Sequence, residues 1–126
     1  MEIISVSMDK GQLAELDRIQ EKLGFGSRSK LLRATIDSML NEYNVLESRR
    51  GHTDAVFTVT HASHGADSLS RLLNEFEDVI KTEVHQHHKS ICLRVLISCG
   101  DAKRVKELFS HLKRTKGIRS VQVSVL

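Results

Sequence analysis

Residues 82–98, TEVHQHHKSICLRVLIS, contain two strand-like runs separated by a short polar break. The first run, TEVHQHH, and the second run, ICLRVLIS, both have the length of a strand, and the second is rich in β-branched and aliphatic residues. Because only two or three residues separate the runs, we expect them to form an antiparallel hairpin. The flanking elements can then be assigned outward from this hairpin.

A helix is expected on each side of the hairpin, and a further strand beyond each helix. Residues 66–80, ADSLSRLLNEFEDVI, and residues 101–114, DAKRVKELFSHLKR, repeat apolar side chains at helical spacing. Residues 55–61, AVFTVTH, and residues 118–125, IRSVQVSV, are predicted strands. The resulting order, β-α-β-β-α-β, predicts a ferredoxin-like or ACT-like domain over residues 54–126.

A smaller β-α-α unit is predicted over residues 1–47, so the fold class is α+β. Residues 3–7 alternate between apolar and polar side chains, which favours a short strand. Two helices should follow, over residues 10–22 and residues 28–46, with Asp9 and Ser27 as their N-caps. The second helix is expected to face the interior with Leu32, Ile36, Met39, Leu40 and Tyr43.

This β-α-α unit is too small to bury a core, and its single strand needs a partner. Antiparallel pairing with the same strand of a second chain would create a two-stranded ribbon that can enter the DNA major groove. The outer face of the strand would then contact base edges, while the start of the second helix would contact phosphates. The predicted DNA-binding residues are Ile3, Ser5, Ser7, Arg28, Ser29 and Arg33.

Composition excludes several classes of function. The net charge is only +3 and no long basic run occurs, so bulk charge alone does not indicate nucleic-acid binding. No apolar run approaches the roughly 20 residues of a membrane span. With two cysteines and no secretory pattern, the sequence favours a reducing cytoplasm. It contains no catalytic constellation typical of an enzyme, so we expect a regulator or binding protein.

Residues 83–92, EVHQHHKSIC, concentrate soft metal ligands in one short stretch. His85 and His87 are two positions apart on a strand and therefore share a face, and Cys92 begins the next strand. Imidazole and thiolate ligands suit Ni(II), Co(II), Cu(II) or Zn(II) rather than calcium or magnesium. His85, His87 and Cys92 are thus predicted metal ligands, whereas Cys99 is expected to be a small buried side chain.

Two longer motifs resemble a known family. SVSMDKGQLAELDRIQEKLGFGSRSKLLRATI, residues 5–36, is similar to ribbon–helix–helix repressors, and HQHHKSICLRVLISCGD follows it at residues 85–101. In this order they resemble the nickel-responsive regulators of the NikR family over essentially the whole chain. The resemblance implies a cytoplasmic DNA-binding repressor that reads an inverted repeat as a homotetramer, a dimer of dimers. It also implies a nickel site of three histidines and one cysteine, with one histidine from a neighbouring subunit.

Two departures from the family pattern leave the fourth ligand open. Four residues separate the second strand histidine from the cysteine, where the family usually has five. The position of the cross-subunit histidine is Glu77 in this chain, and His61, His64 or water are the alternatives. A second hypothesis therefore stays open, in which the ACT-like domain senses a small molecule or serves only oligomerisation, with a vestigial metal site.

Overall fold

The computed structural model describes residues 1–64 and 67–126 of the chain. The chain divides into two compact units, Met1–Asn41 and Glu42–Leu126, which are described separately below. None of the helices in the described ranges is long and apolar enough to cross a membrane. The elements are α1 Lys10–Leu23, α2 Arg28–Glu47, β1 His52–Ala62, α3 Asp67–Glu75, β2 Ile80–His88, β3 Ile91–Asp101, α4 Ala102–Arg114 and β4 Ile118–Val125.

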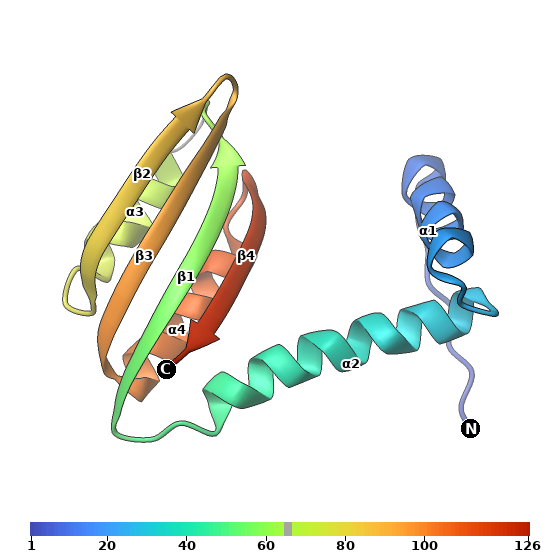
Figure 1. Cartoon of the computed structure of the whole chain (residues 1–126), viewed down its shortest axis with the longest axis horizontal. Coiled ribbons are helices and arrows are strands. Elements are labelled where there is room, and N and C mark those ends of the chain that lie inside the picture. Colours follow the sequence, from blue (N-terminus) through green and yellow to red (C-terminus); the bar gives the residue numbers. More distant parts are fainter. Residues whose placement is uncertain (65–66) are drawn as a thin grey trace. The chain divides into compact units, whose positions relative to one another are not determined.

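The second unit is an antiparallel sheet with helices on one face (Figure 1). Its strands lie in the order β2-β3-β1-β4. This order and the β-α-β-β-α-β sequence of elements confirm the predicted ferredoxin-like, ACT-like arrangement. Side chains of β1 alternate between buried and half-buried, because one face of the strand packs on the helices and the other does not.

The core of this unit lies between the sheet and helices α3 and α4. Phe57 of β1 stacks on Phe109 of α4, with their ring centroids 6.3 Å apart. Helix α3 buries three leucines, and α4 buries a stripe at helical spacing. The largest fully buried side chains are Phe57, Phe76, Leu46, Leu96, Leu108, Leu112, Val59 and Val105.

Replacing Leu108 by Ala should destabilise the chain strongly, because this side chain of α4 is 0% exposed. The lost apolar contacts and the cavity left behind should lower the free energy of unfolding by about 2–5 kcal/mol. Urea denaturation followed by circular dichroism measures this change. Leu126→Ala is a matched control, because Leu126 is 74% exposed and should alter the free energy by less than about 0.5 kcal/mol. Equal unfolding midpoints for both variants would contradict the assignment of Leu108 to the core.

The helix boundaries in the first unit confirm the predicted caps. The Asp9 carboxylate accepts a hydrogen bond from the Gln12 backbone N–H at 2.7 Å, and α1 begins after it. Gly24 ends this helix in the left-handed conformation, with φ at 76°. The Ser27 hydroxyl accepts from the Lys30 backbone N–H at 3.1 Å, as expected for the N-cap of α2.

The predicted strand at residues 3–7 is not formed in the single chain. The described residues before α1 contain no regular secondary structure, and Ile3, Ile4 and Val6 are exposed. A strand is stabilised by hydrogen bonds to a neighbouring strand, and the sequence analysis expects that neighbour to come from a second chain. The predicted inner face of α2 is likewise exposed at Ile36, Met39, Leu40 and Tyr43.

Helix α3 is shorter than the sequence predicts. It ends at Glu75, and the chain turns over residues 76–79 before β2 begins at Ile80. The buried side chains of Phe76 and Val79 continue the helical pattern of apolar residues although their backbone is not helical. Ala66, the predicted start of this helix, lies outside the described residues. Strand β1 is longer than predicted, because it begins at His52, three residues before the expected start at Ala55.

Candidate metal centre

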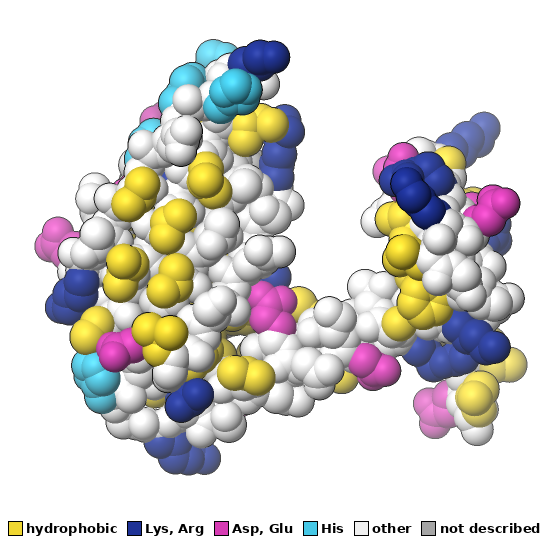
Figure 2. Space-filling view, in the orientation of Figure 1, with side chains coloured by type: hydrophobic (Ala, Val, Ile, Leu, Met, Phe, Trp, Pro, Cys, Tyr) yellow, Lys and Arg dark blue, Asp and Glu magenta, His cyan; other side chains and the backbone are white. Residues whose placement is uncertain are grey.

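The strand register brings metal-ligating side chains together at one end of the sheet. Cys92 of β3 lies opposite His61 of β1 on one side and opposite His87 of β2 on the other. His85 lies opposite Arg94, two residues further along β3, and therefore points to the same face. Figure 2 shows histidine side chains gathered at this end, where the β2–β3 hairpin turns.

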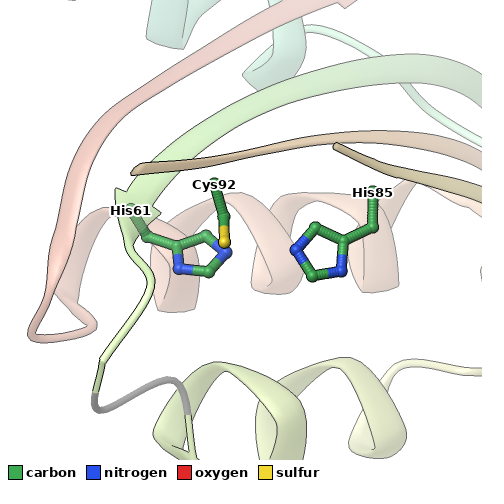
Figure 3. A group of neighbouring side chains, drawn as sticks. All are labelled: His61, His85 and Cys92. Carbon is green, nitrogen blue, oxygen red and sulfur yellow. The ribbon is translucent and has the colours of Figure 1, made fainter. Parts of the chain in front are cut away.

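Three of these side chains converge closely. Ligand atoms of His61, His85 and Cys92 all lie within 4.8 Å of one another, on the side of the sheet that carries the helices (Figure 3). His61 and Cys92 are each 3% exposed, whereas the third member, His85, is exposed to solvent. The Nδ1 atom of His87 lies 3.1 Å from the Cys92 sulfur. His85, His87 and Cys92, the ligands expected from the sequence, are therefore neighbours, and His61 joins them.

Hydrogen bonding fixes the tautomer of His61. Its Nδ1 atom lies 2.7 Å from the carbonyl oxygen of Ala62, so this nitrogen carries the proton and donates. The Nε2 atom accepts from Arg94 Nε at 3.0 Å and therefore presents a lone pair. Metal-ligating histidines commonly donate their second ring N–H in this way, which orients the ring. His61 is therefore neutral and suited to bind a metal through Nε2.

Arg94 contributes a positive charge to the same face of the sheet. Its guanidinium also donates to the carboxylate of Glu83 on β2, so the charge is partly compensated. Local desolvation of the ring, followed by the nearby Arg94 cation, lowers the pKa of the exposed His85 imidazole below its ordinary value. His85 consequently stays neutral, as metal coordination requires, to a lower pH than an ordinary histidine.

The other predicted fourth ligands are not part of this group. Glu77 lies in the turn before β2, whose first residue, Ile80, pairs with Ser98. Ser98 is six positions along β3 from Cys92, which is about 20 Å in a strand. Glu77 therefore does not reach the cluster within one chain. His64 belongs to neither of the close groups of metal-ligating side chains found among the described residues.

The sequence analysis did not identify Arg94 as part of this site. Its position two residues after Cys92 on a strand places both side chains on one face, and that spacing is the signal that could have found it. His61 lies opposite Cys92 only because of the register in which β1 pairs with β3. Local sequence does not fix the register between strands so far apart, so His61 was only one of several alternatives.

The predicted DNA-binding residues lie in the first unit. The side chains of Ile3, Ser5 and Ser7 are exposed in the segment before α1, and Ser29 and Arg33 are exposed on α2. All six except Ser5 line one groove that also contains apolar side chains of α1 and α2. Their role in DNA binding stays a prediction.

Arg28 is already paired within the first unit. Its guanidinium donates two hydrogen bonds to the carboxylate of Asp17, at 2.8 and 2.9 Å. This bidentate pair raises the pKa of Arg28 and lowers that of Asp17. Arg28 is therefore less available for contact with a DNA phosphate than the sequence analysis expects.

Comparison with solved structures supports the fold of the second unit. An uncharacterized protein from Thermotoga maritima matches with a TM-score of 0.55 and 18% sequence identity. The match covers 60% of this chain and 98% of that protein. At this level of identity the likeness concerns the fold alone.

Comparison of sequences gives the family. A protein of Methanococcus maripaludis strain C5, named as a nickel-responsive regulator, is 31% identical over all of this chain and 92% of its own length. A protein of the same name from Methanocaldococcus jannaschii is 29% identical, with the same coverage. Residues 55–126 match the profile of the NikR C terminal nickel binding domain. Because the relatives span the whole chain and the profile covers more than half of it, the chain belongs to the NikR family.

Proposed function

We propose that this chain is a nickel-responsive, DNA-binding transcriptional regulator and not an enzyme. The observation that carries the proposal is the convergence of His61, His85 and Cys92 on one face of an ACT-like sheet. The sequence relatives, which span the whole chain, are named as nickel-responsive regulators. We therefore propose a cytoplasmic location, where such a regulator meets its DNA.

The donor set fits nickel. Imidazole nitrogens and one thiolate suit Ni(II) and the neighbouring Co(II), Cu(II) and Zn(II), and they do not suit calcium or magnesium. We assign His85, His87 and Cys92 as ligands, with His61 of the same chain as the fourth. When bound, the metal would join β1, β2 and β3 at the hairpin end of the sheet. Arg94 would have to leave His61 Nε2, because a guanidinium and a divalent cation repel each other.

Exposed apolar surfaces support a homotetramer built as a dimer of dimers. In the first unit, Ile4 is 79% exposed and Ile36 is 54% exposed, which a paired ribbon and its helices would cover. In the second unit, the sheet face opposite the helices carries hydrophobic side chains (Figure 2). Val84 and Ile97, which are 54% and 42% exposed, belong to this face by the strand register. Each surface is suited to contact with a second copy of the chain.

The assembly makes a direct prediction. We expect the full chain to be a tetramer at micromolar concentration, as measured by light scattering after gel filtration. Ile97→Lys should reduce the mass of the particle, because it places a charge on the uncovered sheet face. Lys103→Glu, on the exposed start of α4, serves as the charge-changing control and should leave the mass unchanged. A wild-type monomer would contradict the proposed assembly.

Arg33 is expected to contact a DNA phosphate. Arg33→Ala should weaken binding to specific and unrelated DNA alike, and it should reduce the slope of log K against log salt by about 1. Arg28→Ala should have a smaller effect, because Asp17 already binds this guanidinium. Arg119→Ala, at an exposed position on β4 of the second unit, is the matched control. Fluorescence anisotropy over a salt series measures all three, and an unchanged slope for Arg33→Ala would exclude the phosphate contact.

The proposed function is tested by titrating nickel while DNA binding is measured. The metal should change the affinity for an operator containing an inverted repeat by about 5–150-fold, the range of a coupling of about 1–3 kcal/mol. The operator can be selected from random duplexes with the nickel-loaded protein. DNA binding that does not respond to nickel, cobalt, copper or zinc would instead support the second hypothesis, in which the ACT-like domain senses a small molecule or only oligomerises.

A further inference from the structure

A second group of metal-ligating side chains lies at the opposite end of the sheet. Asp54 of β1 pairs directly with Cys99 of β3, and His52 is two residues earlier on β1. In a strand this spacing places His52 on the same face as Asp54 and Cys99. Cys99 is therefore half-buried and has polar neighbours. The sequence analysis expects a buried small side chain there, and that prediction is wrong.

The backbone around His52 is held in place on both sides. Gly51 has a positive φ of 68°, and its carbonyl oxygen accepts a hydrogen bond from the Ala102 backbone N–H at 2.7 Å. His52 itself pairs with Asp101 in the β1–β3 ladder. The histidine is thus the first residue of a paired strand, and the residue before it is hydrogen-bonded to the start of α4.

The three side chains converge on one point. His52 Nε2 lies 2.8 Å from Asp54 Oδ1 and 3.3 Å from Cys99 Sγ. Ligand atoms of all three residues lie within 4.8 Å of one another. In a catalytic relay the carboxylate and the nucleophile bind opposite ring nitrogens of the histidine. Here both approach the same nitrogen, so the arrangement resembles a ligand set and not a relay.

We propose that His52, Asp54 and Cys99 form a second transition-metal site, which takes Zn(II). One imidazole, one carboxylate and one thiolate are all established zinc ligands. Three protein ligands leave a fourth tetrahedral position for water, and the side chains of His52 and Asp54, 63% and 48% exposed, leave room for it. The thiolate makes the set unsuitable for calcium or magnesium.

Hydrogen bonding within the group describes its state without metal. The Cys99 thiol, and after it His52, donate to Asp54 and lower the pKa of its carboxyl. The same bond to Asp54 raises the pKa of the Cys99 thiol. Because a thiol coordinates a metal as the thiolate, metal binding releases the Cys99 proton to solvent.

The second site is independent of the first. Asp54 and His61 are seven positions apart on β1, so they point to opposite faces of the sheet. The same spacing separates Cys92 from Cys99 on β3, about 23 Å along the strand. No ligand is shared, and each site can be removed while the other is kept.

The test uses cobalt(II) as a spectroscopic probe in the full-length Cys92→Ser variant. Because the chain has two cysteines, Cys99 is then the only thiol. We expect a thiolate-to-cobalt charge-transfer band that saturates at one cobalt per chain and disappears when zinc(II) is added. The band should be absent after the further change Cys99→Ser. His52→Ala should weaken cobalt binding at least tenfold, and Asp54→Asn should weaken it to a smaller extent.

His88→Ala in the same Cys92→Ser background is the matched control, because His88 lies opposite Ile91 at the turn of the hairpin, outside both groups. It should leave the band and its affinity unchanged. Far-UV circular dichroism checks that each variant stays folded. Absence of the band in the Cys92→Ser protein would overturn the proposal. So would a band of equal affinity in the His52→Ala variant, because that result would mean that a single thiol binds cobalt without a built site.

Discussion

Cys92→Ala is expected to lower the nickel affinity of the protein by at least about 100-fold. Replacing a residue that only orients a metal ligand already lowers metal affinity by about 10–100-fold, and Cys92 is itself a proposed ligand. Cys92 is the only thiol in the group formed by His61, His85 and Cys92, the first cluster, and it is 3% exposed. Its sulfur lies between His61 and His87 in the sheet register, so no neighbouring side chain replaces it. Competition with a chromogenic chelator measures the affinity of the wild type and the variant.

Cys99→Ala is the matched control for this experiment. It also removes one thiol, but from the opposite face and the opposite end of the sheet. It should leave nickel binding at the first cluster within about twofold, since sites without shared partners are close to additive. Wild-type binding should also weaken as pH falls, because the Cys92 thiol must lose its proton to coordinate. If Cys92→Ala and wild type bound nickel equally and weakly, the cluster would not be a working sensor site.

The sequence was sufficient to predict the hairpin, the helices and their order. Residues 82–98 contain two runs of strand length separated by two or three residues, which predict a hairpin, and the structure has β2 and β3 there. The caps at Asp9 and Ser27 were predictable, because each depends on one side chain and on a backbone N–H three residues away. These are local interactions, which are the kind that a sequence pattern reports.

The features that the sequence did not predict depend on residues far apart in the chain. His61 meets Cys92, and Asp54 meets Cys99, only because β1 pairs with β3 in one register. A shift of one residue would send each side chain to the other face. The end of α3 was also misplaced, because Phe76 and Val79 are buried by a turn as effectively as by a helix. Apolar periodicity reports burial and does not distinguish the two backbones.

The fourth ligand separates two descriptions of the site, and a pair of variants tests them. If His61 of the same chain completes the set, His61→Ala removes a direct ligand and should reduce nickel affinity by at least about 100-fold, whereas Glu77→Gln should leave it within about twofold. The reason is geometric. The ligand atoms of His61, His85 and Cys92 lie within 4.8 Å of one another, and because Nδ1–H of His61 donates to the Ala62 carbonyl, Nε2 is the nitrogen that carries the lone pair. Glu77 lies near the other end of β2 and does not reach the cluster in its own chain.

The opposite result has an equally specific meaning. A loss of nickel affinity in Glu77→Gln alone would assign the fourth position to a neighbouring subunit, and the affinity should then fall when the tetramer is diluted into dimers. Because His61 is 3% exposed, its replacement also removes packing, so the free energy of unfolding must be measured for both variants. A loss of nickel affinity in His61→Ala that remains when the protein is fully folded belongs to the metal site.

With His61 as the ligand, metal binding must also release Arg94 from His61 Nε2, so the Arg94 guanidinium changes its partner whenever the site is filled. That exchange couples the buried cluster to Glu83 and the exposed edge strand β2, and it provides a physical route by which metal occupancy changes the surface of the ACT-like domain.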